Sequence, residues 1–449
     1  MIKVITYGTY DKLHYGHIRL LERAKQLGDY LIVGVTSDDY DKTRGKINLQ
    51  QSLMERVEAV KATGIPDEVI VEEYEGQKID DIKHYDVDIF TVGSDWTGYF
   101  DYLKEYCKVV YLERTQGVSS TELRTKENEI RLGLVGDAED RILNKYLDET
   151  SYVNGIIVSG VCTSNAKLKD DLTNKVSFLT DSYDELLKAS DAVYILSHPE
   201  RHYEQIKKAL EMGISVLVES PISLDKASCE ELFQLAKMNG VVLMEALKTA
   251  YATAYTRLLL LVKSGKIGHV VSVDSACTSI RNIEEDHDLN QVWNSISAWG
   301  PTGFLPIIQL LGTDYKRVNM NSLFANKQKN FDAFTKVDFT YQNAVASARV
   351  GRGVKTEGEL VISGTKGYIY VPAPWWKTDY FEVRYEDLEK NKRYFYQLEG
   401  EGIRNELVAF VRAVAGGKKT SNISKEESLA IADIMSHFYT EDVNELTIE

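Results

Sequence analysis

The chain has 449 residues, too many for one ordinary domain, so two or three domains are expected. Hydrophobic residues make up 43% of it and charged residues 27%, a balance typical of soluble globular proteins. The formal net charge of −15 argues against a general nucleic-acid-binding or anionic-membrane-binding surface. A nucleotide needs only a local basic pocket and is not excluded.

Cysteine usage and hydropathy favour a cytoplasmic protein. The four cysteines are far apart and lack the spacing of metal-binding motifs, which is typical of reduced thiols. The chain enters an apolar segment at once, so we expect no signal peptide. The longest purely aliphatic run, Leu258 to Val262, is too short to span a bilayer.

The first part of the chain, up to about residue 129, alternates between short apolar runs and amphipathic segments. Strands are predicted at Ile2–Thr6, Tyr30–Val35, Glu68–Val71, Ile89–Val92 and Lys108–Tyr111. Helices are predicted between them at Ile18–Leu27, Gln51–Thr63 and Lys78–Tyr85. Buried strands alternating with helices indicate an α/β fold with a parallel sheet covered on both faces.

The first strand leads into a short loop with histidines at the start of the first helix. The stretch reads Thr6-Tyr-Gly-Thr-Tyr-Asp-Lys-Leu-His-Tyr-Gly-His17. Backbone N–H groups and the helix dipole make a helix N-terminus a site for anions, above all phosphate. Two imidazoles there can donate to charge that moves during phosphoryl or nucleotidyl transfer. The other interpretation is a capped helix with two surface histidines.

Two later segments also follow predicted strands and favour the functional interpretation. The turn Gly93-Ser-Asp-Trp96 follows the fourth strand, and the segment from Arg114 to Arg124 follows the fifth. In parallel sheets, ligands bind at the carboxyl ends of the strands near the switch in strand order. Ser119 and Glu122 form a capping box for a last helix, whose N–H groups can also hold a triphosphate.

Together, these motifs resemble those of the glycerol-3-phosphate cytidylyltransferase family. The matching segments are Thr6-Tyr-Gly-Thr-Tyr-Asp11, His14-x-Gly-His17, Gly93-x-Asp-Trp96 and Arg114-Thr-x-Gly-Val-Ser-Ser-Thr121. The similarity extends through the intervening sequence and covers residues 1–125. The last segment is typical of cytidylyltransferases, whereas adenylyltransferases share only the histidine motif.

The resemblance implies that a polyol-phosphate oxygen attacks the α-phosphorus of CTP and releases pyrophosphate, with Mg²⁺ bound through the CTP phosphates. Such a reaction depends on positioning and charge stabilisation rather than on a covalent intermediate. The resemblance gives the catalytic roles to His14, His17, Lys46 and Arg114, with Arg44 as an alternative to Lys46. The product would be a precursor of cell-envelope polysaccharide.

The resemblance also implies which residues contact the two substrates. Those expected to bind the nucleotide are Thr9, Tyr10, Asp11, Gly16, Arg114, Thr115, Ser119, Ser120 and Thr121. Those expected near the acceptor are Asp38, Asp95 and Trp96. Asp11 would orient a histidine or assist Mg²⁺. Gly64 stands where the family often has an arginine, so we expect a small phosphorylated polyol as acceptor, with glycerol 3-phosphate as the first choice.

A second α/β pattern begins after the polar junction Thr125-Lys-Glu-Asn-Glu129. Its strands are predicted at Ile130–Gly136, Gly155–Val161, Ala192–Leu196 and Ser215–Val218, with helices that include Tyr203–Met212 and Lys226–Asn239. A β-rich part follows, with strands at Val270–Ala276, Phe331–Tyr341, Ala344–Val350, Glu359–Ile362 and Tyr368–Val371. We expect a cytidylyltransferase domain at 1–127, a second Rossmann-like domain at 128–250 and a mostly antiparallel α+β sheet domain at 251–449.

Several segments of this second half resemble the Gfo/Idh/MocA oxidoreductase family. They are His198-Pro-Glu-Arg-His202-Tyr-Glu, Val218-Glu-Ser-Pro221, Leu243-Met-Glu-Ala246, Lys263-Ser-Gly-Lys-Ile-Gly268, Ser363-Gly-Thr-Lys-Gly367 and Pro374-Trp-Trp376. The resemblance covers residues 130–440 and implies descent from sugar or polyol dehydrogenases that use NAD(P). The two resemblances together imply a homodimer.

The residues expected to carry oxidoreductase chemistry are altered. The phosphate turn keeps Gly136 but has Ala138 at its second glycine position, beside carboxylates that would repel a pyrophosphate. The lysine of the family's Glu-Lys-Pro motif is replaced by Ser220, which follows Glu219. Lys248 is either a displaced catalytic lysine or a solvated or paired one. These departures argue against NAD(P).

Three roles for the second half therefore stay open. It is a degenerate module for assembly or regulation, a reductase that makes the acceptor from a keto-polyol phosphate, or a module that senses a sugar or nucleotide. Reduction needs titratable groups within hydrogen-bond reach, and two expected ones are replaced, at Ser220 and in the Ala298-Trp-Gly300-Pro-Thr302 segment. A structural role is favoured for His202. The sequence favours a non-catalytic or altered module.

Overall fold

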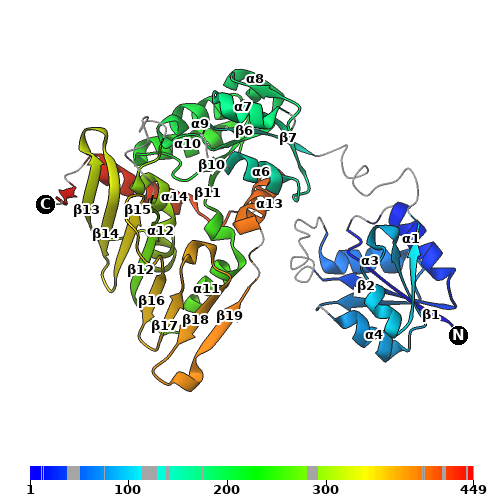
Figure 1. Ribbon diagram of the computed structural model, residues 1–449. Coiled ribbons are helices and arrows are strands. Elements are labelled where there is room, and N and C mark those ends of the chain that lie inside the picture. Colours follow the sequence, from blue (N-terminus) through cyan, green and yellow to red (C-terminus); the bar gives the residue numbers. More distant parts are fainter. Residues whose placement is uncertain are drawn as a thin grey trace. The chain divides into compact units, whose positions relative to one another are not determined.

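The structure is a computed structural model with two compact units, Met1–Glu129 and Ile130–Glu449 (Figure 1). The described residues are 1–11, 13, 15–37, 51–74, 76–113, 129–137, 142–173, 175–280, 292–396, 398, 400–416, 421–440 and 443–447.

The first unit is built on a parallel five-stranded sheet in the order β3-β2-β1-β4-β5. The strands are β1 (Lys3–Gly8), β2 (Tyr30–Thr36), β3 (Glu68–Glu72), β4 (Ile89–Gly93) and β5 (Lys108–Leu112). The helices are α1 (Tyr15–Lys25), α3 (Leu53–Ala62) and α4 (Gln77–Tyr85), with short 3₁₀ turns η1 (Ser94–Trp96) and η2 (Asp101–Glu105). The five predicted strands and the three helices predicted between them are present, with ends shifted by less than one helical turn, whereas the last helix predicted near Ser119 lies outside the described residues.

Helices cover both faces of this sheet, as the apolar strands predict. Successive strand residues point to opposite faces. Val4 therefore packs with Leu21 of α1 and Val57 of α3, whereas Ile5 packs with Ile82 of α4. The continuous apolar runs are explained by burial on both sides.

The opening loop follows β1, at the point where the strand order of the sheet reverses. β1 pairs with β2 on one side and with β4 on the other, with Gly8 opposite Val35 and Thr6 opposite Thr91. The chain leaves β1 toward β2 and returns later to β4. The loops after β1 and β4 therefore open at the same edge, where parallel α/β sheets bind ligands.

The second unit begins with a parallel six-stranded sheet in the order β11-β10-β9-β6-β7-β8. Its strands are β6 (Ile130–Val135), β7 (Ile156–Cys162), β8 (Leu179–Thr180), β9 (Ala192–Ile195), β10 (Ser215–Glu219) and β11 (Leu243–Ala246). Its helices are α6 (Ile142–Thr150), α7 (Ala166–Leu172), α8 (Tyr183–Ala189), α9 (His202–Glu211) and α10 (Lys226–Asn239), with the turn η3 (Pro199–Arg201). This is the strand order of a dinucleotide-binding Rossmann fold.

The rest of the unit is a mixed, mostly antiparallel nine-stranded sheet in the order β19-β18-β17-β16-β12-β15-β14-β13-β20. Its strands are β12 (Val270–Thr278), β13 (Arg317–Asn326), β14 (Phe331–Thr340), β15 (Val345–Gly351), β16 (Leu360–Gly364), β17 (Tyr368–Val371), β18 (Tyr380–Arg384), β19 (Lys392–Phe395) and β20 (Asn444–Glu445). Its helices are α11 (Thr253–Lys263), α12 (Ser295–Leu311), α13 (Ile403–Val414) and α14 (Lys425–Thr440). Short turns are η4 (Lys248–Tyr251), η5 (Lys327–Lys329), η6 (Trp375–Lys377), η7 (Leu388–Lys390) and η8 (Gly400–Gly402). The predicted fold class is confirmed in both units.

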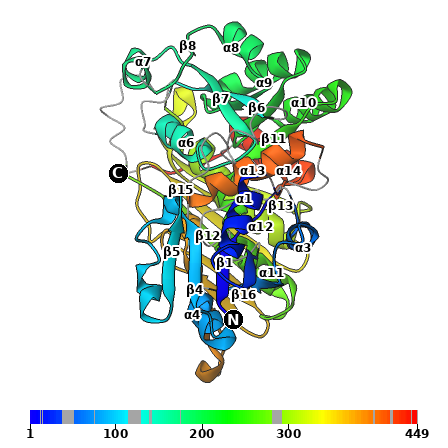
Figure 2. The ribbon, with the colours of Figure 1, turned by 90° about the vertical axis from the view of Figure 1, so that its right-hand side faces the viewer.

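The two sheets of the second unit are joined by the late helices. α12 packs on β12, β14 and β15, whereas α13 returns to α6 and α14 returns to α10. Both views show α13 beside α6 (Figures 1 and 2). Among the described residues, no helix is both long and apolar enough to cross a membrane.

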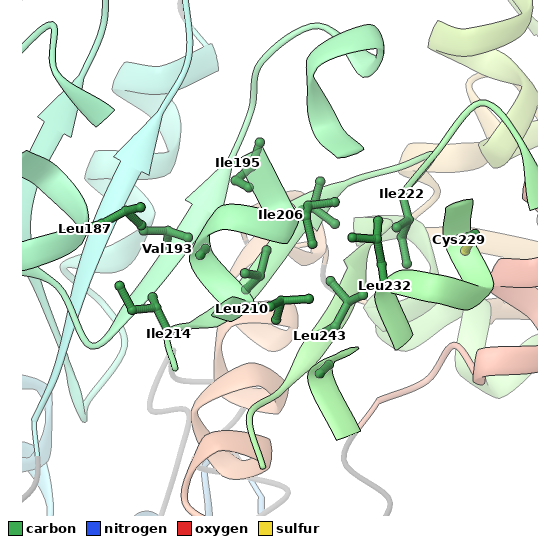
Figure 3. Packing of buried hydrophobic residues seen from close by; sticks show 14 of the residues in the cluster. Leu187, Val193, Ile195, Ile206, Leu210, Ile214, Ile222, Cys229, Leu232 and Leu243 are labelled. Carbon is green, nitrogen blue, oxygen red and sulfur yellow. The ribbon is translucent and has the colours of Figure 1, made fainter. Parts of the chain in front are cut away.

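A buried cluster fixes α9 and α10 to the six-stranded sheet (Figure 3). Ile206 and Leu210 of α9 lie in one contiguous group with Leu232 of α10 and Leu243 of β11. Ile206 and Leu232 are fully buried. The helices therefore hold the carboxyl ends of β9 and β10 in place.

We expect Ile206→Ala to lower the free energy of unfolding by about 2–5 kcal/mol, because it removes a buried side chain and leaves a cavity. Met238→Ala, on α10 at a side chain that is 75% exposed, is the control and should change it by less than about 0.5 kcal/mol. Urea unfolding followed by circular dichroism measures both. Equal losses in the two variants would contradict this account of the core.

Candidate functional site

The loop after β1 is anchored by Tyr10. This residue has φ +54, a left-handed conformation that is rare for a bulky side chain, and its ring is buried in the cluster that contains Leu21. A Cβ on Gly8 would lie 2.9 Å from Tyr10 Cζ, so the ring needs a glycine there. The ring meets His17 edge-on at 5.4 Å between centroids. Tyr10 can thus face a ligand only through its backbone, while its ring packs against His17.

A buried arginine ties the same loop to two other segments. Arg56 of α3 is fully buried, and its Nη1 donates to the carbonyls of Thr9 at 2.6 Å and Thr36 at 2.8 Å. Its Nε donates to the carbonyl of Gln51 at 3.3 Å. The buried carboxylate of Asp11 accepts the N–H of Gln51 at 3.0 Å. The loop after β1, the end of β2 and the start of α3 are therefore held together.

Arg56 was not among the sequence-predicted site residues. It lies on the apolar face of its helix with Val57 and Val60, which are both buried. A charged residue in the middle of a helix's apolar stripe is a signal for a buried polar network. That signal was present in the sequence.

Gly16 and His17 lie in the first turn of α1, and both are half-buried. Asp95 and Trp96 lie in η1 directly after β4, and the Trp96 ring packs against Tyr99 at 5.3 Å. Because β1 and β4 are neighbours, the structure brings the predicted residues of the first loop and of η1 to one edge of the sheet.

The end of β5 is also tied to α1. Arg23 Nη1 donates to the carbonyl of Glu113 at 2.8 Å, one residue before the predicted nucleotide segment begins. The other predicted residues of the first unit lie outside the described residues. They are His14, Asp38, Arg44, Lys46, Arg114, Thr115, Ser119, Ser120 and Thr121. Their roles stay predictions.

Within the described residues, no group of three or more His, Cys, Asp or Glu side chains could hold a metal ion. One oxygen of Asp11 already accepts the N–H of Gln51.

In the second unit, the turn after β6 is occupied by an internal carboxylate. Gly136 follows β6, and Asp137 then accepts hydrogen bonds from the N–H of Ser164 at 2.6 Å and the hydroxyl of Thr163 at 3.1 Å. Arg201 Nη1 lies 2.7 Å from the other carboxylate oxygen. Burial would raise the pKa of Asp137, but these bonds hold it below its usual value. An internal carboxylate therefore occupies these donors at the end of β7 and on Arg201. Ala138 lies outside the described residues.

The serine that replaces the family's lysine is part of a buried hydrogen bond. The Ser220 hydroxyl donates to Glu245, and both residues are buried. Lys248 Nζ lies 2.9 Å from Glu401 Oε2, which places Lys248 among paired lysines. Ser220 and Lys248 therefore each have a partner within the second unit.

Glu219 belongs to a buried proton-sharing group. Tyr194 OH lies 3.2 Å from Glu219 Oε2 and 3.1 Å from Glu406 Oε1, and Tyr146 OH lies 3.2 Å from Glu219 Oε1. One phenolic hydrogen cannot be donated to two carboxylates, so one carboxyl must keep its own proton. Burial raises the pKa of Glu219 and raises that of Glu406 well above its usual value. The pair of carboxyl groups therefore keeps one proton between them.

His202 is fully buried at the start of α9. Its two ring nitrogens lie 2.8 Å from the carbonyl oxygens of Pro221 and Ser197. Burial lowers the pKa of His202 to about 4. These contacts support the structural role.

Comparison with known proteins gives the same two parts. A cytidylyltransferase-like family matches residues 5–126, and an oxidoreductase family with an NAD-binding Rossmann fold matches residues 131–247. The glycerol-3-phosphate cytidylyltransferase of Bacillus spizizenii is 50% identical over 124 residues, which are 95% of its length and 28% of this chain. That of Staphylococcus aureus is 47% identical over 124 residues, 93% of its length and 28% of this chain.

Through its first unit, the chain belongs to the cytidylyltransferase-like family. It is a nucleotidyltransferase whose second part is an oxidoreductase-family domain. KijD10, a 3-ketoreductase of Actinomadura kijaniata, has a TM-score of 0.64 to this chain, covering 72% of it and 100% of KijD10. At 19% identity, this likeness shows a shared fold.

We expect Arg56→Lys to lower kcat/KM for CTP by about 10²-fold, because a single ammonium nitrogen cannot take the places of both Nε and Nη1, so the loop after β1 shifts. Pyrophosphate release in the presence of CTP, Mg²⁺ and glycerol 3-phosphate measures this effect. Glu58→Gln, on the exposed side of the same helix, is the matched control and should leave kcat/KM unchanged. Full activity in Arg56→Lys would show that the arginine does not position the loop.

Proposed function

We propose that the first unit transfers a cytidylyl group from CTP to a small polyol phosphate, with glycerol 3-phosphate as the leading acceptor. The observation that carries the proposal is the common edge of the β1 loop, the start of α1 and η1, at the switch between β1 and β4. The identity of 50% to a glycerol-3-phosphate cytidylyltransferase supports the acceptor class. A CDP-polyol of this kind would supply cell-envelope polysaccharide.

In the proposed reaction, a phosphate oxygen of the acceptor attacks the α-phosphorus, and the bond to pyrophosphate breaks. His17, at the helix N-terminus, donates to charge that develops on the phosphates. We assign Thr9 and Asp11, in the loop after β1, to the CTP phosphates, and Asp95 and Trp96, in η1, to the acceptor and the base. The CTP phosphates would hold a Mg²⁺ ion, which would supply positive charge for the leaving pyrophosphate.

We expect His17→Ala to reduce pyrophosphate release by two to three orders of magnitude, since it removes a donor to transition-state charge. His84→Ala, at an exposed histidine of α4, is the matched control and should retain full activity. Circular dichroism should show both variants folded. Retained activity in His17→Ala would defeat its role, and equal turnover with ATP would overturn the choice of CTP.

A second candidate function concerns the second unit. The first possibility is a reductase that uses NAD(P)H to make the acceptor. The oxidoreductase-family match and the fold shared with an NADP-bound ketoreductase support it. The Asp137 bonds and Ser220 favour instead a non-catalytic or altered module for assembly, regulation or sensing. We propose the latter, in a homodimeric cytoplasmic protein.

Calorimetric titration of the full chain with NADH and with NADPH separates these two roles. We expect no binding at millimolar cofactor, because Asp137 occupies the donors at the end of β7. Asp137→Asn keeps the size of the side chain but removes its charge, and it tests whether the carboxylate is the obstacle. Saturable binding to the unaltered chain with consumption of NAD(P)H and a keto-polyol phosphate would establish the reductase instead.

A further inference from the structure

Three lysines from separate parts of the second unit converge on one carboxylate. Lys145 of α6 lies 2.5 Å from Glu401 Oε1, Lys377 of η6 lies 2.9 Å from the same oxygen, and Lys248 of η4 lies 2.9 Å from Oε2. The three lysine side chains are 38%, 41% and 27% exposed, respectively. A small solute can therefore approach this group from water.

The charges around Glu401 do not balance. Burial alone would raise the pKa of Glu401, but hydrogen bonds from the three lysines lower it to about 2. Glu149 is paired with Arg404 at 2.5 Å, and Glu219 and Glu406 together keep one proton. Among the described residues, Glu401 and the Glu219–Glu406 pair therefore supply two negative charges to three ammonium groups. Within the described part of the chain, these lysines carry more positive charge than the carboxylates beside them neutralise.

The backbone that presents Glu401 is strained. Glu401 has φ +51, a left-handed conformation that is uncommon for glutamate, between Gly400 and Gly402. A Cβ on Gly402 would lie 2.3 Å from the carbonyl oxygen of Lys248, so the turn can sit against η4 only with glycine there. Strain of this kind persists where the surroundings impose it, and it is concentrated at ligand sites.

The group also lies where a parallel sheet binds ligands. Lys248 comes two residues after β11, and α6 is the first helix after β6. Lys377 reaches the group from the nine-stranded sheet domain, in the turn between β17 and β18. Ligands of open α/β sheets lie outside the carboxyl ends of the strands. Ammonium groups bind phosphate as point charges, and a phosphate dianion matches three of them better than one carboxylate does.

We propose that Lys145, Lys248 and Lys377 form a binding site for the phosphate group of a small phosphorylated polyol, and that Glu401 fills this site when the ligand is absent. The phosphate replaces the carboxylate, and the η8 turn moves away from the lysines. The site needs neither NAD(P) nor CTP. It gives the second unit a ligand of the same chemical class as the proposed acceptor, but it stands independently of the proposed function of the first unit.

The test uses the full chain with Glu401→Gln, which removes the internal competitor. Calorimetry with inorganic phosphate and with glycerol 3-phosphate, at constant ionic strength set with sodium chloride, should show at least tenfold tighter binding of each than in the unaltered chain. Lys377→Gln should abolish this binding, whereas Lys366→Gln, an exposed lysine in the turn between β16 and β17, should not. All substitutions lie in the second unit, so any binding by the first unit is a constant baseline.

A structural ion-pair cluster gives different results. Phosphate and chloride would then stabilise Glu401→Gln equally in thermal unfolding, and Lys377→Gln would not change phosphate binding; either result overturns the proposal. Binding of inorganic phosphate without glycerol 3-phosphate would overturn the ligand class. If Glu401→Gln does not fold, Lys377→Gln alone decides the matter, because it must weaken phosphate binding relative to Lys366→Gln.

Discussion

The carboxyl edge of a parallel sheet is the constraint on which both units depend. Strand ends, helix N-termini and the loops between them place N–H groups and cations at that edge, and this positive potential must be met by an anion. In the first unit, Arg56 and Tyr10 shape the β1 loop from inside and leave the edge to a substrate. These two buried side chains fix the shape of the loop, and they leave its exposed face to the ligand.

In the second unit, carboxylates of the chain itself bind the N–H groups and cations described above. Asp137 takes the donors at the end of β7 together with Arg201, and Glu401 takes the three lysines near β11. A fold that evolved around anionic ligands can keep its strand order after such changes, because the core depends on apolar packing rather than on the edge. The second unit therefore keeps the strand order of the fold although residues of its ligand-binding motifs have changed. The two internal carboxylates differ in their described partners, since Asp137 is paired with one arginine whereas Glu401 is paired with three lysines.

The sequence predicted the α/β fold class, the strands of the first parallel sheet, four strands of the second and the replaced lysine at Ser220, because these depend on local patterns. It did not predict β8 and β11 of the second sheet, nor α12, whose interior contains Pro301 and Pro306 although Asn294 caps its start. It also did not predict contacts between distant positions. Lys248 and Glu401 are 153 residues apart, and no local pattern pairs them. For Arg56, the sequence predicted the helix that carries it but not its hydrogen bond to the carbonyl of Thr9, which is a tertiary contact.

The β1 loop of the first unit and the three-lysine group of the second share one feature, a non-glycine residue in the left-handed backbone conformation. Among the described residues, the non-glycine residues with positive φ are Tyr10, Asp86, Asn330 and Glu401. Asp86 and Asn330 follow helical segments as C-caps, and their residue types tolerate the left-handed conformation. Tyrosine and glutamate do not favour the left-handed conformation, so tertiary contacts must hold the backbone of Tyr10 and Glu401 in it. Tyr10 is held by a buried ring beside His17, and Glu401 by three lysines. In the proposed phosphate site, a competing anion would replace the contacts that hold Glu401, whereas the contacts of the Tyr10 ring are apolar and offer an anion nothing to replace.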